Sequence, residues 1–325
     1  MNTHYKIEKY TPKHYRLWND FVAGAKNATF LFHRDFMEYH GDRFEDFSLL
    51  VFKNGDLISV FPANIAGQNL HSHQGLSYGG FVFDHKIRFK DCLETVKHTL
   101  QYCVEHQIKS MHLKLIPKIY HRTPADEIDY ILFLLGAKLT RRDLSSSVLI
   151  AKHHFSRDRR QGIKRGQKNK LRIAEESGFT AFWNELLIPR LQHKHHKNPV
   201  HSLEEIRYLK AKFPEKIRQF NVYNGDKIVA GTTVFESAQV AHSQYTASNA
   251  DKNSLGSLDL LHHHFITEVF NAKTYFDFGI SNEKEGKHLN EGLLYWKQGY
   301  GNASVVHDFY EIDPGTYLCL NPVFI

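Results

Sequence analysis

The stretch VYNGDKIVAG at residues 222–231 repeats a turn that occurs earlier in the chain, in VFKNGDLISV at residues 51–60. Asn-Gly between runs of Val, Ile, Phe and Tyr predicts a tight hairpin, because Asn and Gly tolerate the positive φ angles that such a turn requires. Each hairpin precedes an aromatic, glycine-containing segment and then a helix-like pattern. The repetition predicts that the chain contains a duplicated domain.

A chain of 325 residues, 42% of them hydrophobic, exceeds the usual size of one hydrophobic core, so we expect two domains. The longest apolar run, near residues 131–135, is far too short to cross a bilayer, and the start, MNTHYKIEKY, lacks the apolar core of a secretion signal. Cys92, Cys103 and Cys319 form no paired spacing, which agrees with a reducing compartment. We therefore expect a cytoplasmic protein without membrane insertion.

The formal charge of +7 and the pI of about 9.1 favour anionic partners such as phosphates, nucleotides or nucleic acid. Histidine is frequent, with 23 residues and runs at 193–196 and 262–264. Adjacent helix positions point in different directions, and no HExxH motif or acidic triad accompanies the runs. We therefore predict no metal site.

The first half has the pattern of a hairpin followed by a helix, a buried strand, a second helix and a closing strand. Its predicted elements are two early helices, the hairpin and these later elements: 12–24, 33–40, 51–60, 89–106, 111–117, 124–135 and 147–150. The second half repeats this order. Its predicted elements are the hairpin at 222–231, then 241–249, 254–270, 274–281, 289–300 and 303–313.

This order predicts an α/β fold of two tandem domains, each a mixed β-sheet flanked by helices. Parallel pairing is expected where a helix separates two strands, since such a crossover returns the chain in the same direction. We place the domains at residues 1–150 and 151–325. Oligomeric state is left open.

Between the halves lies RDRRQGIKRGQKNKLR at residues 157–172, with eight Lys or Arg and one Asp. One interpretation is a solvated linker helix without a function. The other is a basic surface that binds a phosphate-bearing ligand. No aromatic residue interrupts the segment, so the stacking pattern of single-stranded nucleic-acid binding is missing.

Downstream, ASNADKNSLGSLDLL at residues 247–261 carries a strand into a helix. Ser254, Gly256 and Ser257 would leave free backbone N–H groups at the helix start, which favours an anion such as pyrophosphate. An ordinary N-cap explains the same residues.

Two strands of the second half carry polar residues where a central strand is normally apolar. TYFDFGIS at 274–281 contains Asp277, which we interpret as a carboxylate paired inside the fold. The strand at 241–249 alternates between two polar faces. His242, Gln244 and Thr246 lie on one face, and Ser243, Tyr245 and Ala247 on the other.

The stretch YWKQGY at residues 295–300 resembles the closing pattern of the GNAT acetyltransferase superfamily. The duplicated order, the FGIS segment before a helix and the basic helix between the halves are similar to the FemAB/FemX branch, whose members contain two GNAT domains in tandem. The nearest likeness is to tandem-GNAT N-acetyltransferases of nucleotide-linked amino sugars in surface-polysaccharide pathways. It runs through HKNPVHSLEEI, VAGTTVF, SQYTAS, FGISNEKEG and LNEGLLYWKQGYG.

The resemblance implies acetyl-CoA as co-substrate, with its pantetheine arm along residues 242–248 and its pyrophosphate at 254–257. Two departures stand out: KNSLGSL keeps a single glycine of the usual phosphate loop, and Asn290 lies five residues before Tyr295 instead of seven. Only the second domain is expected to bind the cofactor. The expected cofactor-binding residues are Tyr245, Thr246, Ser254, Leu255, Gly256, Ser257, Asn290 and Lys297.

By the same resemblance, the substrate amine attacks the thioester directly and Tyr295 is the acid for the leaving thiolate. Glu283, His242 and His201 are the candidates for the base, and a water relay could serve instead. Each of them has an ordinary structural role as its alternative. The expected substrate-binding residues are Lys164, Arg165, Gln244 and Asn282.

The predicted function is therefore acetyl-CoA-dependent N-acetylation of a nucleotide-linked (dTDP or UDP) amino sugar, without nucleic acid as partner. The alternative is a Fem-type aminoacyltransferase that uses aminoacyl-tRNA on a peptidoglycan precursor, which the basic pI suits. Against it, residues 176–216 are expected to hold only short helices, around Phe182 and Ile206, instead of the long helical hairpin of several such proteins. A binding protein that kept the fold without catalysis is the third possibility.

Overall fold

The computed structural model describes residues 3–324, and of residues 194 and 195 it describes the backbone only. The chain forms two compact units, one of Met1–Asp143 with Val306–Ile325 and one of Leu144–Val305. The division inferred from sequence, at residues 150 and 151, kept the C-terminal segment in the second domain. It packs with the first unit because Phe309–Ile312 pair antiparallel with Met111–Lys114.

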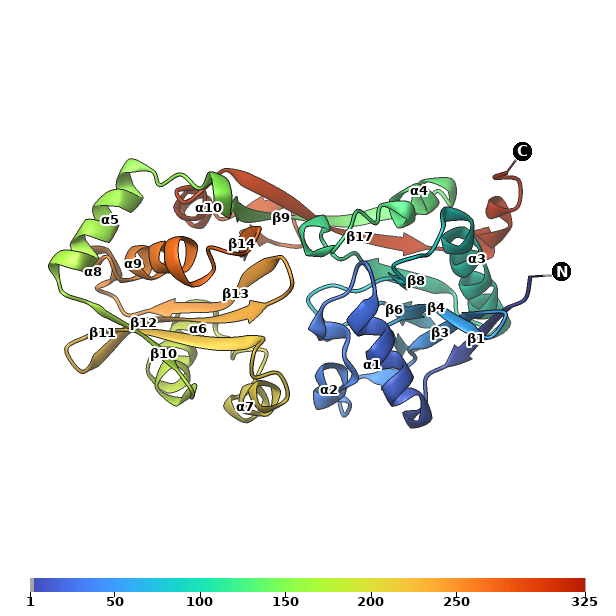
Figure 1. Cartoon of the computed structure of the whole chain (residues 1–325), viewed down its shortest axis with the longest axis horizontal. Helices are drawn as coiled ribbons and strands as arrows, with labels where there is room; N and C mark the ends of the chain where they lie inside the picture. The colour runs from blue at the N-terminus through green and yellow to red at the C-terminus, as the bar shows by residue number, and fades with distance from the viewer. Residues whose placement is uncertain (1–2, 325) are drawn as a thin grey trace. The chain divides into compact units, whose positions relative to one another are not determined.

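The first unit contains two sheets, ordered β1-β3-β4-β7 and β17-β8-β6-β5-β2. In Figure 1, α4 lies above these strands, α3 lies beside them at the right, and α1 and α2 lie at the lower left of the unit. Its strands are β1 (Tyr5–Lys9), β2 (Glu45–Asp46), β3 (Leu49–Lys53), β4 (Asp56–Phe61), β5 (Asn64–Ala66), β6 (Asn69–His71), β7 (Val82–Phe83), β8 (Ser110–Lys114) and the end of β17 (Ala303–Ile312). Its α-helices are α1 (Tyr15–Gly24), α2 (Arg34–Met37), α3 (Phe89–Glu105) and α4 (Glu127–Leu134).

The second unit is built on a sheet ordered β10-β11-β12-β13-β14-β9. Figure 1 shows α5, α8 and α9 on one face of this sheet and α6 and α7 on the other. Its strands are the end of β9 (Lys138–Leu149), β10 (Arg172–Glu176), β11 (Ile217–Asn224), β12 (Lys227–Glu236), β13 (Val240–Ser248), β14 (Tyr275–Ile280), β15 (Asn282–Glu283) and β16 (His288–Leu289). Its α-helices are α5 (Arg157–Lys168), α6 (Ile188–His195), α7 (Leu203–Lys212), α8 (Lys252–Leu255), α9 (Ser257–His264) and α10 (Glu291–Gln298).

Both hairpins predicted from Asn-Gly-Asp form, but their turns differ by one residue. In β3–β4, Lys53 pairs with Asp56, so Asn54 and Gly55 are the loop, and both have positive φ. In β11–β12, Asn224 pairs with Lys227, so the loop is Gly225 and Asp226. Only Gly225 of that loop has a positive φ, which is typical of a type II′ turn with glycine first.

The duplication continues in the parallel strand pairs. In the first unit, residues 69–71 of β6 pair with residues 110–112 of β8, with α3 between them along the chain. In the second unit, residues 240–242 of β13 pair with residues 275–277 of β14, with α9 between them. Parallel pairing thus occurs where a helix intervenes, and the predicted α/β class with mixed sheets is confirmed.

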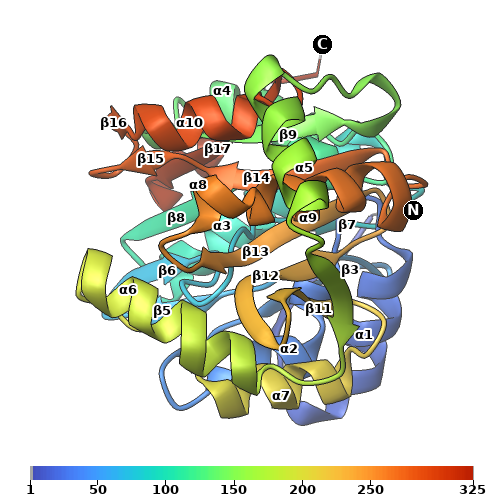
Figure 2. The same ribbon diagram turned by 90° about the vertical axis from the view of Figure 1, so that its left-hand side faces the viewer.

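Helix α5 packs unusually close to the start of α9 (Figure 2). A Cβ atom at Gly162 would overlap Asp259 Oδ2, and one at Gly256 would overlap Gly162 O. Gly166 faces Gly256 O and Leu260 in the same way. The core of the second unit contains a group of aromatic residues, with Phe220, Phe265 and Phe276 buried together.

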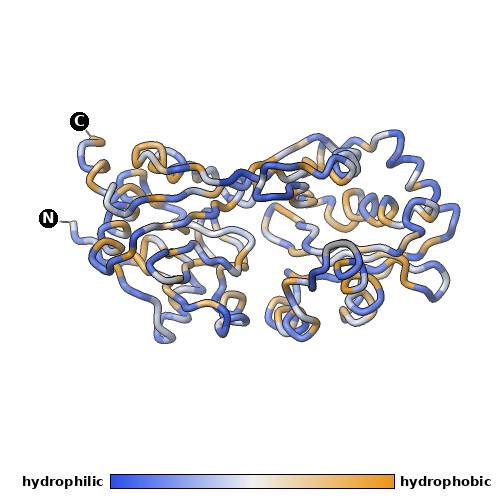
Figure 3. The backbone as a smooth tube through the Cα atoms, turned by 180° about the vertical axis from the view of Figure 1, so that it is seen from behind, coloured by the Kyte–Doolittle hydropathy of each residue, from blue (hydrophilic) through white to orange (hydrophobic). Residues whose placement is uncertain are grey.

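Hydrophobic and hydrophilic residues alternate along the backbone (Figure 3). Among the described residues, no helix combines the length and the apolar character that a transmembrane helix needs.

Replacing Gly162 by Ala should destabilise the second unit by about 1–3 kcal/mol, because the new methyl group has no space against Asp259. Urea unfolding followed by tryptophan fluorescence measures the change. Gly178→Ala is the matched control, since nothing lies within 4 Å of its Cβ position. Equal midpoints for the two variants would contradict the close packing of α5 on α9.

Candidate functional site

Strands β13 and β14 separate after a short parallel pairing. Their last paired residues are His242 and Asp277, whereas β13 continues to Ser248. Gly279 has φ +75°, which redirects β14. On its other edge β13 contains a bulge: Thr233 pairs with Tyr245 and Val234 with Ser243, so Gln244 has no counterpart on β12. The backbone of β13 beyond His242 therefore lies beside a pocket instead of a neighbouring strand.

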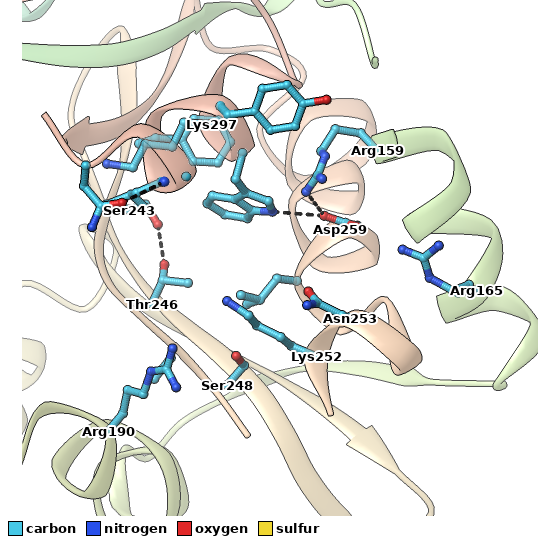
Figure 4. Close-up of a pocket in the computed structure, with 18 of the residues that line it drawn as sticks. Arg159, Arg165, Arg190, Ser243, Thr246, Ser248, Lys252, Asn253, Asp259 and Lys297 are labelled. Carbon is cyan, nitrogen blue, oxygen red and sulfur yellow. Dashed lines mark hydrogen bonds and ion pairs between the residues drawn. The ribbon is translucent and has the colours of Figure 1, made fainter. Parts of the chain in front are cut away.

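This pocket has a volume of about 640 Å³. Figure 4 shows that its side chains come from β13, from α5 and α6 on opposite sides, from α8 and from α10. Its polar lining includes Arg159, Arg165, Arg190, Ser243, Thr246, Ser248, Lys252, Asn253, Asp259, Asn290, Tyr295 and Lys297.

The lining is strongly cationic, with three arginines and two lysines against one carboxylate, Asp259. Asp259 Oδ1 accepts hydrogen bonds from Arg159 Nη1 at 2.7 Å, Trp296 Nε1 at 3.0 Å and the Tyr300 hydroxyl at 2.9 Å. That carboxylate therefore balances only Arg159. Within the described residues, Nε of Arg165 is buried without a hydrogen-bond partner. The arrangement favours an anionic ligand with several charges.

Lys297 connects the pocket to the parted strands. Its ammonium group donates to Gly279 O at 2.9 Å and Ile280 O at 2.7 Å, which are the carbonyls where β14 leaves β13. Burial lowers the pKa of Lys297 to about 8, although the Asp277 carboxylate opposes this shift. The ammonium is thus a poorly solvated charge that can stabilise negative charge developing on an acyl oxygen.

His242 and Asp277 form a hydrogen-bonded pair at the last parallel position. His242 Nδ1 lies 3.0 Å from Asp277 Oδ2, and Asp277 Oδ1 accepts from Ser145 Oγ at 2.6 Å and Gly279 N at 3.0 Å. A carboxylate in this environment is an acceptor, so the imidazole donates through Nδ1 and its basic nitrogen is Nε2. The pair has the form of an oriented general base.

Five of the predicted site residues line the pocket: Arg165, Thr246, Asn290, Tyr295 and Lys297. Tyr295 is 61% exposed, and its hydroxyl donates to Asp158 Oδ2 at 2.8 Å, which raises the pKa of this phenol. Asn290 caps α10, with Oδ1 accepting from Leu293 N.

Tyr245 and His201 meet each other instead of the pocket. The Tyr245 hydroxyl lies 2.6 Å from His201 Nδ1, and its ring packs edge-on against Trp183. Burial raises the pKa of Tyr245 to about 12. The two residues therefore belong to the packing of the segment before α7 on β13.

The expected phosphate cradle is largely occupied by the protein itself. Leu255 N donates to Asp251 O and Gly256 N to Lys252 O, while Ser257 is fully buried. Gly256 is covered by α5, as described above. Of this loop, the pocket is lined instead by Lys252 and Asn253. Ser254 is exposed and its hydroxyl donates to Asp251 O.

The remaining predicted residues lie elsewhere in the second unit. Glu283 is exposed and accepts from Asn290 Nδ2 at 3.2 Å. Asn282 bonds Leu144 N and Gly286 O, so its amide holds local backbone. Gln244 is the bulge residue, and Lys164 is exposed on α5.

Several lining residues were missed by the sequence reasoning, notably Arg159, Arg190, Lys252 and Asp259. Arg159 and Lys252 lie in the basic stretch and the loop that the sequence singled out, so a helix-face argument could have found them. Nothing in the sequence distinguishes Arg190 from a surface residue.

Among the described side chains, no group of three or more His, Cys, Asp and Glu could hold a metal ion. In the run at 262–264, His262 Nδ1 donates to Leu258 O, and burial lowers the pKa of His262 to about 4. The run at 193–196 falls partly on the side chains of residues 194 and 195, outside the described set.

The fold and the pocket of the second unit are those of a GNAT-type domain. Residues 152–298 match the family described as an acetyltransferase (GNAT) domain, so the second unit carries such a domain. None of the curated protein sequences is similar enough to this chain to count as a match. The predicted resemblance is confirmed for the second unit by the family match, and FemX and a tandem GNAT protein share the fold of the whole chain.

The whole chain is similar in fold to FemX, at 12% identity and a TM-score of 0.65, over 97% of this chain and 99% of that one. A tandem GNAT protein from the clavulanic acid biosynthesis pathway matches at 10% identity and a TM-score of 0.51, over 96% and 99%. L-PGS from Bacillus licheniformis matches at 10% identity and a TM-score of 0.56, over 97% of this chain and 98% of that one. At such identities the likeness concerns the fold.

Lys297 should titrate near pH 8, well below an ordinary lysine. Between about 8 and 10.5 the unfolded chain holds the proton that the folded chain has lost, so the free energy of unfolding should rise with pH across this window. Urea unfolding at several pH values should show this rise in the wild type relative to Lys297→Met. The exposed Lys287→Met should behave as the wild type, and an identical pH dependence of all three proteins would contradict the buried ammonium.

Proposed function

We propose that the chain is an acetyl-CoA-dependent N-acetyltransferase that acts on the amino group of a nucleotide-linked (dTDP or UDP) amino sugar. The observation that supports it most is the cationic pocket beside the parted strands β13 and β14 of a GNAT domain. A coenzyme A diphosphate carries several negative charges, which matches an excess of arginine and lysine better than a neutral substrate would.

The residues present fit such a donor, although by side chains more than by backbone amides. Arg165, whose Nε is buried without a partner, Arg190 and Lys252 would hold its phosphates. Ser243 and Thr246, whose hydroxyls lie 2.8 Å apart, would face its arm along β13. The coenzyme would supply an acetyl group activated as a thioester.

Each step of the transfer has a candidate residue. His242 Nε2 takes a proton from the acceptor amine as its nitrogen bonds to the acyl carbon, with Asp277 holding the imidazole. The Lys297 ammonium stabilises the charge on the acyl oxygen. As the carbon–sulfur bond breaks, the thiolate needs a proton, for which Tyr295 is the candidate at the pocket rim.

A second candidate function is supported by one specific feature, the covered start of α9. Helix α5 packs on Gly256, and Ser257 is fully buried. The backbone N–H groups at this helix start are therefore not open to the diphosphate of the coenzyme. An aminoacyl-tRNA donor to a peptidoglycan precursor would need cationic side chains for its 3′-terminal phosphates, which the pocket also offers. The FemX-like fold agrees with this donor.

A donor assay separates the two functions. Purified protein with acetyl-CoA and a panel of dTDP- and UDP-linked amino sugars should release free thiol, and Arg165→Gln should raise the KM for acetyl-CoA about tenfold or more. Lys168→Gln, exposed on the same helix, is the control and should leave the KM unchanged. No thiol release across the panel, together with acyl transfer from aminoacyl-tRNA, would replace the first function by the second.

The pH profile tests the roles of the two titrating groups. The rate should fall above pH 8 as Lys297 loses its proton, and Lys297→Arg should move this limb upward because guanidinium stays charged. His242→Gln should lower kcat by about 10²–10⁴-fold, because the proton acceptor is lost, while the affinity for coenzyme A stays unchanged. A limb that stays near pH 8 in Lys297→Arg would remove this lysine from the transfer step.

A further inference from the structure

A second pocket, of about 360 Å³, lies in the first unit. Its lining includes His71 and His112, which are the last residues that pair between the parallel strands β6 and β8. Thr140, Phe309 and Tyr310 of the same unit complete its wall. The pocket therefore lies at the point of the first unit that corresponds, in strand order, to the parting of β13 and β14.

The equivalent pair of residues differs in charge between the two units. His71 takes the place of His242, and His112 takes the place of Asp277. The two imidazole rings stack with centroids 4.7 Å apart and planes inclined by 14°. The buried carboxylate of the second unit is thus replaced by a stacked pair of imidazole rings, and burial, together with the neighbouring His112, lowers the pKa of His71.

The charge of this pocket comes from Lys114. Its ammonium donates to Leu76 O at 3.1 Å, which is the hydrogen bond it makes among the described residues, and it lies 5.6 Å from the centre of the Phe309 ring. At least one of its three donors therefore remains for a ligand. Burial lowers the pKa of Lys114 to about 8, with Arg141 adding to the shift, so the group is still mostly protonated at pH 7. A half-buried cation of this kind favours an anion as its partner.

No acidic side chain lines this pocket among the described residues. Arg141 and Asp143, which act on the pKa of Lys114 in opposite directions, pair with each other through hydrogen bonds of 3.0 and 2.6 Å. The pocket therefore keeps one net positive charge.

Ser72 and His73 add neutral polar groups to the lining of this pocket. Ser72 Oγ accepts from Lys114 N at 2.8 Å, which leaves its hydroxyl hydrogen for another acceptor. His73 is 3% exposed, has φ +65°, and its Nδ1 has no hydrogen-bond partner among the described residues. Burial lowers the pKa of His73 to about 3, so its ring is neutral.

We propose that this pocket binds the carboxylate of a small planar organic acid, held by Lys114 and Ser72 against the stacked rings of His71 and His112. A single ammonium balances one negative charge, whereas a phosphate monoester or diphosphate would bring two or more. The arginines that suit phosphates line the pocket of the second unit and are missing from the described lining here. The site does not depend on the proposed acyl transfer.

Ligand-observed fluorine NMR on the full chain tests the proposal, with 4-fluorobenzoate as probe and 4-fluorobenzamide as the neutral control of equal shape. Benzoate should bind at least tenfold more tightly than the amide, and Lys114→Met should reduce its affinity to that of the amide. Lys109→Met, exposed on the segment before β8, should bind as the wild type. Equal affinities for the acid and the amide, or no binding of either at millimolar concentration, would overturn the site.

Amine labelling of the unmutated chain gives a measurement that does not depend on the folding of a variant. 4-Fluorobenzoate should protect Lys114 from reductive methylation, as read by mass spectrometry, and should leave Lys297 unprotected. 4-Fluorobenzamide should protect neither lysine. Inorganic phosphate is the competing anion. If it protected Lys114 at the same concentration as 4-fluorobenzoate does, the assignment to a carboxylate would be overturned.

Discussion

The parting of β13 from β14 after three residue pairs is the constraint on which the site depends. Two strands that separate inside a sheet leave backbone groups without ladder partners, and buried carbonyls of this kind must find other donors. Lys297 supplies them for Gly279 and Ile280, and this placement removes its ammonium from water. The same parting leaves Asp277 at the end of the pairing, where it orients His242. A depressed lysine pKa and an oriented imidazole therefore follow from one local feature of the sheet.

Duplication supplied this feature twice, and the two copies have diverged at their chemical positions. The parallel pairs align residue for residue, yet His-Asp in one unit corresponds to His-His in the other. In addition, each unit contains a strand that comes from a distant part of the chain. The strand β8 of the first unit pairs with residues from the end of the chain, while β14 of the second pairs with residues 145–149 from its middle. A cut at residue 150 would therefore deprive both units of a strand.

The sequence predicted the parts of the structure that local chemistry decides. Asn-Gly located both hairpins, and periodic apolar residues located helices such as α3 within one residue of its end. It did not predict the bulge at Gln244, which depends on pairing with β12. The strict alternation assumed for this strand placed Ser243 and Thr246 on opposite faces, whereas their hydroxyls hydrogen-bond to each other in the pocket. Arg190 was missed because only tertiary packing of α6 brings it to the site.

The basic segment has a packing role that neither interpretation of it from sequence included. As a helix, α5 presents Gly162 and Gly166 to α9, and their missing side chains permit an approach at which a Cβ would collide with Asp259 or Leu260. The same approach brings Arg159 within 2.7 Å of Asp259 and places Arg165 in the pocket wall. Close packing thus covers the backbone amides at Gly256 and at the same time provides arginines nearby. In the proposed function, side-chain charges would therefore hold the phosphates in place of main-chain dipoles, and the affinity would depend more strongly on salt than that of a helix-terminus cradle.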